Sequence, residues 1–403
     1  MKGGWQIKTL GEICEIARGG SPRPIKNFIT TDPNSINWIK IGDATASGKY
    51  IYKTEEKIKP EGVRRSRMVY EGDFILSNSM SFGRPYIMKT TGCIHDGWLV
   101  LHQPKIDPDY LYHVLSSDLV FSQFDRLAAG STVRNLNIGL AKSVEIPYPP
   151  LPEQQRIVGI LDEAFEDIDT AKANAEKNIQ NARALFESHL QSIFTQRGDG
   201  WMEKRLGDVA ESISTGPFGT MLHKSDYVPD GIPLVNPMNL VNSRIVPSNK
   251  MMVNKQTRKR LSSYVLKTGD IVIGRRGELG RCALVTEREE GWLCGTGSFL
   301  VRLSDRMDGT FFVALFGSQQ FKARLEGSSV GTTMSSLNHG ILNNLRLPVP
   351  PIAAQRKAML RADKLLAKTQ RLESIYQQKL TALDELKKSL LHRAFNGELT
   401  NDN

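Results

Sequence analysis

The sequence predicts an α+β protein with two repeated globular domains and two long helices. The chain has 403 residues, more than a single hydrophobic core usually serves. Short apolar runs punctuated by Gly, Pro and Asp occur in two separate blocks, a pattern typical of strands joined by turns. A long polar stretch with apolar residues at helical spacing follows each block. We therefore expect the order block, helix, block, helix.

The two blocks are copies of each other. The opening from Trp5 to Ile13 recurs from Trp201 to Val209, with Leu, Gly and an acidic residue at matching places. The run from Gly72 to Arg84 recurs from Gly269 to Arg281, and later elements return in the same order, 196 to 201 positions apart. Self-similarity at a nearly fixed distance indicates an internal duplication.

Domain boundaries follow from this repeat. We expect a first domain at residues 1–150, a helix within 151–200, a second domain at 201–351 and a second helix within 352–403. Each domain should end in a Pro-rich extended strand followed by a Pro-rich helix start, where the missing N–H of proline costs no helical hydrogen bond. Strands are expected at residues 38–41, 74–76, 98–101, 271–273 and 299–301, and one short helix per domain at 109–127 and 309–325.

The two long helices carry narrow apolar stripes. The first runs from Leu161 through Phe165 to Ile193, and the second from Leu365 to Leu390, including Leu372 and Leu386. A narrow stripe between charged faces is typical of a coiled coil. We expect the helices to pair with each other in antiparallel fashion, with the domains related by a pseudo-twofold axis. The alternative is that each helix packs on its own domain.

Charge and cysteine content narrow the class of protein. The formal net charge of +10 fits a polyanionic partner such as nucleic acid, although many basic proteins bind none. The four cysteines form no CxxC pair, so reduced thiols in a cytosolic protein are the simple interpretation. The N-terminal residues contain no secretory h-region, and no apolar run is long enough to cross a bilayer. We expect a cytoplasmic protein without a membrane partner.

Catalytic signatures are absent from the sequence. The run from Gly42 to Tyr50 resembles a phosphate loop, but it has five residues between the glycines and Tyr after the lysine. Asn236-Pro237-Met238-Asn239 lacks the aromatic residue of an amino-methyltransferase loop. No HExxH, GxSxG or metal-spaced Cys/His cluster is present. We expect no catalytic residue, cofactor or metal in this chain.

Basic and polar loops recur at equivalent places in both blocks. Taken singly, each loop is most simply a solvated surface, but side chains on such loops can read base edges while nearby cations bind phosphates. The frame residues around the loops persist between the copies while the loop contents differ, which indicates two readers with different preferences. The candidate DNA-binding residues of the first domain are Arg18, Ser21, Arg23, Lys26, Arg64, Arg67, Asn78, Ser79, Ser81, Arg84, Thr132, Arg134 and Asn135. Those of the second domain are Lys224, Asn236, Asn239, Arg258, Arg260, Arg275, Arg276, Arg281, Thr332, Ser335 and Asn338.

A family resemblance rests on these same features. The two block openings, the junction from Ile146 to Val158 (IPYPPLPEQQRIV), and helices ending in Phe194 and Phe395 make the chain similar to the specificity subunits of type I restriction–modification enzymes. The likeness spans essentially the whole length. The second junction, Pro350 to Arg356, departs from the pattern because it lacks the acidic residue of the first.

The resemblance implies a non-catalytic subunit with two target-recognition domains. Each domain would read one half of an asymmetric, split target in double-stranded DNA. The helices would bind two adenine-methyltransferase subunits, and restriction motor subunits would join the full complex. AdoMet, ATP and Mg²⁺ would belong to those partner chains. The expected partner-contact residues are Glu153, Gln154, Arg156, Phe165, Phe186, Phe194, Gln355, Arg356 and Phe395.

Two other functions remain open from the residues alone. The chain could be a coiled-coil adaptor whose repeated domains bind proteins, or a self-contained DNA enzyme, which the missing motifs disfavour. Salt-sensitive binding to duplex DNA separates the first of these from a DNA reader. Methylation or cleavage of DNA by the purified chain would support the second.

Overall fold

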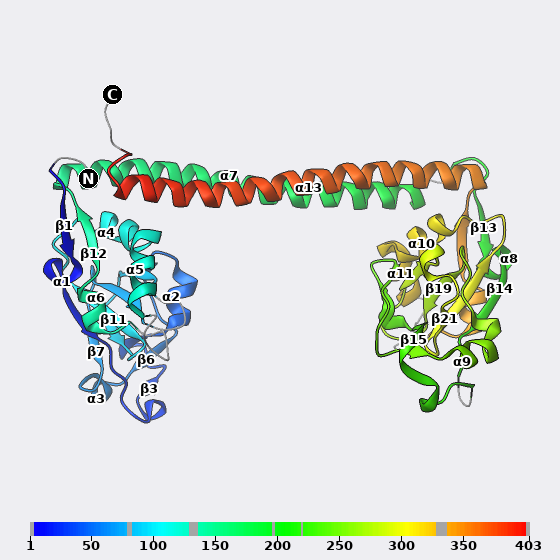
Figure 1. The fold of residues 1–403 in the computed structure, drawn as a ribbon, viewed down its shortest axis with the longest axis horizontal. Helices are drawn as coiled ribbons and strands as arrows, with labels where there is room; N and C mark the ends of the chain where they lie inside the picture. The colour runs from blue at the N-terminus through cyan, green and yellow to red at the C-terminus, as the bar shows by residue number, and fades with distance from the viewer. Residues whose placement is uncertain are drawn as a thin grey trace. The chain divides into compact units, whose positions relative to one another are not determined.

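The computed structural model describes residues 4–78, 83–128, 136–195, 198–218, 221–327 and 337–399. The chain divides into two compact units. Unit 1 comprises Met1–Glu176 with Gln377–Asn403, and unit 2 comprises Lys177–Tyr376. Each unit therefore contains one globular domain and segments of both long helices (Figure 1). In the parts of the chain described here, no helix is both long and apolar enough to cross a membrane.

In each unit, the first strand of the domain pairs with its last. In unit 1, β1 (Gln6–Thr9) runs antiparallel to β12 (Glu145–Tyr148). In unit 2, β13 (Met202–Arg205) pairs in the same way with β23 (Arg346–Val349). The short helices α1 (Leu10–Ile13) and α8 (Leu206–Val209) follow β1 and β13. These pairs bring the start of each domain beside the strand that leads into a long helix.

Unit 1 contains two five-stranded sheets. One has the order β2-β11-β8-β9-β5 and the other β3-β6-β4-β10-β7. Alternate residues of β8 face different cores: Phe74 and Leu76 face the helices, whereas Ile75 lies in the core that includes Trp98 and Val100. This period of two is the expected geometry of a strand buried on both faces. The strands are β2 (Glu15–Arg18), β3 (Ile29–Thr30), β4 (Ile36–Ile39), β5 (Tyr50–Ile51), β6 (Glu56–Ile58), β7 (Arg67–Val69), β8 (Phe74–Ser77), β9 (Pro85–Met88), β10 (Gly92–Ile94) and β11 (Trp98–His102).

Unit 2 repeats four strands of the first of these sheets and has a smaller second sheet. Its main sheet has the order β14-β22-β19-β20, beside a three-stranded sheet β18-β15-β21 and a hairpin β16-β17. Ile271 and Ile273 of β19 face the helices, and Val272 faces the smaller core. The strands are β14 (Ala210–Thr215), β15 (Tyr227–Val235), β16 (Leu240–Val241), β17 (Arg244–Ile245), β18 (Met252–Val253), β19 (Ile271–Gly274), β20 (Cys282–Leu284), β21 (Leu293–Cys294) and β22 (Ser298–Leu303). The five strands expected from sequence are present as β4, β8, β11, β19 and β22.

The short helix expected in each domain is in fact two helices. In unit 1, α4 (Pro108–Leu115) is followed by α5 (Asp118–Ala128), and the Ser117 hydroxyl donates to the Val114 carbonyl at 2.6 Å. In unit 2, α10 (Gly309–Gly317) is followed by α11 (Gln319–Gly327), and the Ser318 hydroxyl donates to the Leu315 carbonyl at 2.7 Å. Serine competes for helical carbonyls in this way and ends a helix. The remaining helices are α2 (Ile41–Ser47), α3 (Pro60–Val63), α6 (Ile138–Lys142), α9 (Lys255–Arg260) and α12 (His339–Asn343), with 3₁₀ turns η1 (Ile25–Asn27), η3 (Lys224–Asp226), η4 (Pro237–Asn239), η5 (Ser262–Tyr264) and η6 (Glu287–Glu289).

The long helices α7 (Leu151–Thr195) and α13 (Ile352–Phe395) pack side by side in each unit (Figure 1). In unit 1, Asp169 pairs with Lys387 and Lys172 pairs with Asp384. The residue numbers on α13 therefore fall as those on α7 rise, which means that the helices are antiparallel. In unit 2, Arg183 pairs with Glu373, and the last turns of α7 share a core with the first turns of α13. The expected antiparallel pairing is confirmed within both units.

The apolar seam of this pair differs in detail from the expected stripe. Leu161, Ile168 and Ala175 of α7 are buried at heptad spacing, as a coiled coil requires. In α13, Leu372 and Leu386 are 45% and 47% exposed, so their assignment to the buried stripe was wrong. Two paired helices bury only a narrow seam on each, and residues at its edge remain partly in water.

Candidate nucleic-acid interface

The persistent frame residues of the repeat build the same turn in both units. Gly72 and Gly269 lie at φ of 90° and 92°, a conformation that favours glycine. The next residues are Asp73 and Asp270. Their carboxylates accept hydrogen bonds from the backbone N–H groups of Tyr70 and Lys267, at 2.8 and 2.9 Å. These residues persist because they shape the turn before β8 and β19, and the turn positions the loops beyond those strands.

A second repeated turn lies beside these loops. In unit 1, the Trp98 N–H donates to the His95 carbonyl at 3.1 Å, and the Gly19 N–H donates to the Trp98 carbonyl at 2.9 Å. In unit 2, the Ser298 N–H donates to the Gly295 carbonyl at 3.1 Å, and the Gly216 N–H donates to the Ser298 carbonyl at 2.8 Å. A Cβ at Gly19 or Gly216 would lie 2.0 Å from the carbonyl oxygen of His95 or Gly295. Glycine is therefore required where the two backbones cross.

Asn78 and Arg275 occupy equivalent backbone positions at the ends of β8 and β19. The Asn78 N–H donates to the Gly97 carbonyl, and its own carbonyl accepts from Leu136. The Arg275 N–H donates to the Gly297 carbonyl, and its carbonyl accepts from Leu337. The Arg275 guanidinium also lies 5.2 Å from the Phe299 ring centroid, a cation–π contact. The backbone is thus common to both units while the side chain differs.

The loop after β2 gathers several predicted DNA-binding residues around Asp96. The Ser21 hydroxyl donates to Asp96 Oδ1 at 2.8 Å, and an Arg23 amino group reaches Asp96 Oδ2 at 3.4 Å. Arg18 Nε and Asn78 Nδ2 donate to the Asp96 backbone carbonyl at 3.0 and 2.8 Å. Four side chains that were predicted separately therefore meet at one acidic residue. Asn78 is 2% exposed and its amide is used within this turn, so its assignment to DNA is corrected.

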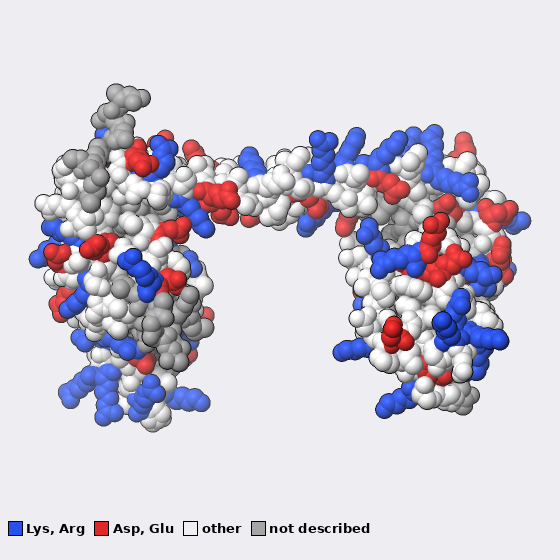
Figure 2. All heavy atoms as spheres, in the orientation of Figure 1, with Lys and Arg blue, Asp and Glu red and all other residues white. Residues whose placement is uncertain are grey.

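The remaining described candidates of unit 1 are exposed cations. Lys26, Arg64, Arg67 and Arg84 lie on the surface. Arg67 Nε donates to the Arg18 carbonyl at 3.3 Å, and the Arg84 guanidinium lies 5.4 Å from the Tyr86 ring. Figure 2 shows Lys and Arg side chains gathered at the lower end of unit 1, in the region of α3 and β3. Such a group of cations is suited to DNA phosphates.

In unit 2, the candidates divide into exposed cations and residues with structural contacts. Lys224 and Arg276 are exposed. Arg258 donates to the Gly291 carbonyl, Arg260 forms an ion pair with Asp226 at 2.9 Å, and Arg281 pairs with Glu278 at 3.1 Å. These three arginines already have partners within the chain, although their side chains remain on the surface.

Two asparagines of unit 2 were assigned to DNA but hold local structure. Asn239 is 3% exposed, and its side chain joins the Asn236 N–H to the Val246 carbonyl. Asn338 caps α12 through a 2.8 Å bond from the Ile341 N–H to its Oδ1. The assignment of Asn239 to DNA is wrong because its buried amide satisfies backbone groups. Asn338 is exposed, and its assignment to DNA stays a prediction. Asn236 is half-buried and lies beside Gly295, which belongs to the repeated turn.

Seven further candidates lie outside the described residues. They are Ser79, Ser81, Thr132, Arg134, Asn135, Thr332 and Ser335.

Four of the residues expected to contact partner subunits are instead internal. Gln154 and Gln355 are buried and accept the Asp107 and Asp308 N–H bonds at 2.9 and 2.8 Å. Both also donate to a proline carbonyl, Pro149 or Pro350, at 2.8 Å. These assignments are corrected, because the glutamines fasten the start of each long helix to the domain. Phe194 and Phe395 are likewise buried, with T-shaped ring contacts to Phe311 and Tyr110.

The other expected partner contacts remain accessible in part. Phe165 and Phe186 are half-buried, and Arg156 and Arg356 are exposed. Lys387 Nζ lies over the Phe165 ring, 4.4 Å from its centroid, and Arg356 Nε lies 3.7 Å from the Asp308 carboxylate. Glu153 is half-buried at the first turn of α7. Their contact with another subunit stays a prediction.

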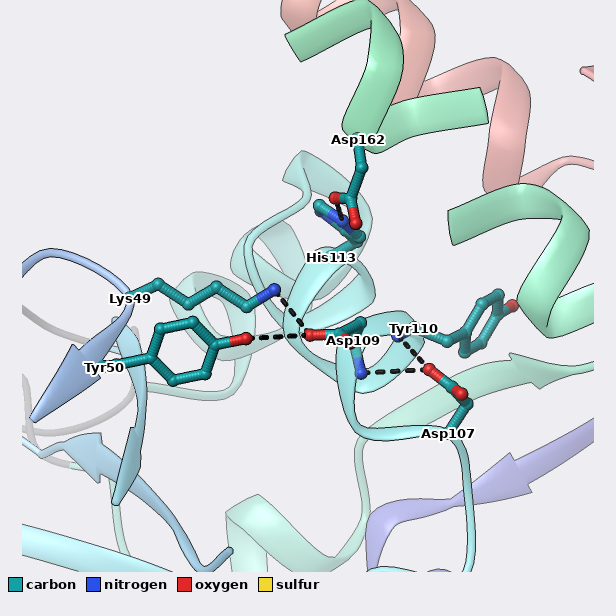
Figure 3. Close-up of polar contacts among 7 residues, drawn as sticks. All are labelled: Lys49, Tyr50, Asp107, Asp109, Tyr110, His113 and Asp162. Atoms are coloured by element: carbon teal, nitrogen blue, oxygen red, sulfur yellow. Dashed lines mark hydrogen bonds and ion pairs between the residues drawn. The ribbon is translucent and has the colours of Figure 1, made fainter. Parts of the chain in front are cut away.

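A polar network in unit 1 joins the domain to α7 (Figure 3). His113 of α4 bonds Asp162 of α7 at 2.8 Å, and Asp109 accepts from Lys49 Nζ at 2.6 Å and from the Tyr50 hydroxyl at 3.2 Å. Burial lowers the pKa of His113, and the bond to Asp162 opposes that shift. The equivalent position in unit 2 is Ala314, so only one domain carries this contact.

The described residues contain no group of three or more His, Cys, Asp or Glu side chains placed to hold a metal ion. All four cysteines are buried free thiols. Burial raises the pKa of the Cys282 and Cys294 thiols to about 12. These cysteines are therefore packing residues, since the thiolate is the nucleophile and metal ligand.

Comparisons with known proteins agree with this architecture. The family model described as "Type I restriction modification DNA specificity domain" matches residues 2–180 and again 198–382. The StySPI specificity subunit of Salmonella potsdam is 23% identical over 98% of this chain and 89% of its own length. The EcoKI specificity subunit of Escherichia coli K12 is 24% identical with the same coverage.

A solved structure shares the fold. The crystal structure of the HsdS subunit from Thermoanaerobacter tengcongensis is 20% identical, covers 99% of this chain and 98% of that one, and gives a TM-score of 0.64. At that identity the likeness establishes the fold alone. The repeated family match covers most of the sequence, and each match falls on one copy of the repeat. The chain therefore belongs to the family of type I restriction–modification specificity subunits, with the family's DNA specificity domain present twice.

Proposed function

We propose that this chain is the non-catalytic subunit that reads a bipartite, asymmetric target in double-stranded DNA for a type I restriction–modification complex. Residues 1–150 read one half of the target and residues 201–351 read the other. The observation that carries the proposal is one backbone framework, present twice, with different side chains at equivalent positions. Asn78 and Arg275 are one such pair, and Asp96 and Thr296 are another.

The chemistry of these pairs supports two different half-targets. The arginine fork of Arg275 matches the O6 and N7 acceptors of guanine, whereas Asn78 at the same place in the first domain is buried and its amide donates to the Asp96 carbonyl. The exposed cations around both loops supply phosphate contacts, which hold the protein in register without reading sequence. Readers of identical backbone and different side chains therefore produce an asymmetric target.

The helices complete the proposal. The 45 residues of α7 correspond to about 68 Å of continuous helix, which is ample to separate two half-targets by a turn of DNA, about 34 Å. The exposed charged faces of α7 and α13 bind two adenine-methyltransferase subunits, which carry AdoMet and the catalytic residues. Restriction subunits with ATP and Mg²⁺ join that complex.

Mapping of methylated adenines tests this function directly. The chain is expressed with methyltransferase subunits, and methylation across the cellular DNA is sequenced. We expect one split motif with a fixed nonspecific spacer. Replacing residues 1–150 by the corresponding domain of a relative should change one half of the motif only, and a change in both halves would contradict the assignment of the domains.

A heptad inserted between Glu163 and Gln191 tests the helix as a ruler. A matched insertion is placed in α13 so that the seam stays in register. The spacer should lengthen, or methylation should be lost if the pairing fails. An unchanged spacer in an active complex would exclude the ruler.

A protein-binding adaptor is the competing function. It predicts no salt-dependent affinity of the chain for duplex DNA, with or without methyltransferase subunits. A DNA reader should instead lose affinity steeply as salt rises, because phosphate contacts release counterions.

A further inference from the structure

Asp96 is the acidic centre of the loops assigned to DNA in unit 1. It lies in the turn from His95 to Trp98, at the position that Thr296 occupies in unit 2. Its side chain is 47% exposed although Ser21 and Arg23 both contact it. The carboxylate is thus held in place and still open to a ligand.

The carboxylate retains capacity for another hydrogen bond. An ionised carboxylate offers about four acceptor positions, and the contacts from Ser21 and Arg23 use two of them, one on each oxygen. The Arg23 bond is long, at 3.4 Å, and the Arg23 side chain is 82% exposed. Arg23 can therefore turn to a phosphate when DNA is present while Ser21 continues to orient Asp96.

The charge of Asp96 points to a base edge as the partner. A carboxylate repels phosphates, so it contributes nothing to backbone binding. The hydrogen bond from Ser21 helps keep the pKa of Asp96 below its ordinary value, so the group is an acceptor at neutral pH. In the major groove, only cytosine N4 and adenine N6 are exocyclic donors to such a group.

We propose that Asp96 is a specificity-determining residue that accepts a hydrogen bond from the exocyclic amino group of a cytosine or adenine in the half-target read by the first domain. Thr296 is its counterpart in the second domain, with a hydroxyl that both donates and accepts. The inference rests on the proposed function and adds to it the class of base that one position reads.

The exchange Asp96→Asn tests the inference with little change of shape. The amide keeps an oxygen for Ser21 but replaces the other acceptor with a donor. We expect the preference at one base pair of one half-target to shift from the amino-bearing base to an acceptor-bearing base, by on the order of tenfold. The other half-target should not change, and affinity for nonspecific DNA should be equal or higher because a negative charge is lost.

The measurement is selection from randomised DNA duplexes by the chain assembled with methyltransferase subunits, followed by sequencing of the bound DNA. Glu71→Gln removes the same charge from an exposed position of the same domain and serves as the matched control, which should leave both half-targets unchanged. Thr296→Asp is the reciprocal variant at an exposed residue and should change only the second half-target. It keeps the test decisive if the loop of the first domain fails to form in Asp96→Asn.

The outcomes separate the inference from the function beneath it. If the wild-type complex selects no split sequence, the proposed function fails. If it selects one and Asp96→Asn selects the same, Asp96 reads no base. A uniform loss of affinity without a changed preference would show that Asp96 only organises the loop around Ser21 and Arg23, and would also overturn the inference.

Discussion

Unit 1 and unit 2 share a backbone framework but differ in their second sheet and in their loop side chains. The strand pairs β1–β12 and β13–β23, the turns at Gly72 and Gly269, and the buried glutamines at the helix starts are the same in both. The second sheet has five strands in unit 1 and three in unit 2, and the side chains at the loop positions differ. The shared parts attach each domain to the helices and fix the backbone, so the outer loops can vary without loss of the fold.

The two units also differ in how the domain contacts the helix. Unit 1 uses the polar pair His113–Asp162, together with the Lys49–Asp109 bond. Both units pack a helix phenylalanine on the domain, Phe395 on Tyr110 and Phe194 on Phe311, but unit 2 has Ala314 at the position of His113 and adds Trp201 to the Phe311 ring. An apolar contact is insensitive to pH between 5 and 8, whereas a histidine contact is not. The comparison leads to four predictions.

The largest effect should come from the aromatic residues that close each core. Phe395→Ala should destabilise unit 1, and Phe194→Ala unit 2, by about 3–5 kcal/mol each, since both rings are buried. Unit-resolved hydrogen exchange measures the change. Phe121→Ala and Phe218→Ala, at exposed positions of units 1 and 2, are the matched controls and should cost little. Equal destabilisation of both units by either core variant would contradict the division of the chain.

The buried glutamines should give the next largest effect. Gln154→Leu leaves the Asp107 N–H and the Pro149 carbonyl without their partner, at a cost of about 1–3 kcal/mol. Gln355→Leu should cost at least as much, because its amide also donates to the Arg306 carbonyl at 2.9 Å. Urea unfolding monitored in each unit tests the order. Gln155→Leu, at an exposed neighbouring position, is the control, and a similar cost there would remove the case for the buried amides.

A smaller, pH-dependent effect is expected in unit 1. Burial holds the pKa of His113 below its ordinary value of 6.5, with Asp162 opposing, so the unfolded chain takes up the proton first as the pH falls. The contribution of His113 is therefore fully present above about pH 6.5 and declines below it. His95, whose pKa burial also lowers, acts in the same direction. Hydrogen exchange at pH 7.5 and 5.5 should show unit 1 losing protection relative to unit 2.

The variant His113→Ala, which copies Ala314, isolates this contact. It should lower the stability of unit 1 at pH 7.5 and reduce the further loss between pH 7.5 and 5.5. Some loss should remain, because burial also lowers the pKa of His95. An unchanged pH dependence in the variant would mean that His113 does not carry the effect.

The smallest effects should follow loss of single exposed cations. Arg64→Ala in unit 1 and Arg276→Ala in unit 2 should each weaken DNA binding to a similar degree for all sequences, and each should lower the slope of log affinity against log salt by about 1. Salt titrations of duplex binding measure this. Arg346→Ala, on β23 beside the start of α13, should leave the slope unchanged. A change of base preference in Arg64→Ala would assign that residue to a base instead.

Much of the fold could be predicted because the repeat and the helical period are strong signals. The break between α4 and α5 could not, because apolar residues continue at helical spacing across Ser117, and only the hydroxyl contact to Val114 reveals the end of the first helix. Leu372 shows a similar limit: the period of a stripe does not say which members lie at the seam and which at its edge.

The loop positions could be compared between the domains from the repeat alone, but the contacts of their side chains could not. Repetition found the loop positions of Asn78 and Arg275, because a common framework recurs around them. Repetition also selects structural residues: Gln154 and Gln355 recur because a proline-rich helix start leaves backbone groups that an amide satisfies. Asp96 was missed because its importance lies in contacts with residues 18, 21, 23 and 78, which are distant in sequence.

The composition of the two cores has a consequence for the order of folding. Leu391, Ala394 and Phe395 complete the core of unit 1, which is otherwise formed by residues before Glu176. Unit 2 is a continuous segment between them. During synthesis the second domain thus has all of its core before the first does, and the first must close a loop around a whole folded unit, an entropic cost that grows only slowly with loop length. A chain that is truncated before residue 391 would have a complete second domain. Its first domain would lack the end of α13, which completes its core.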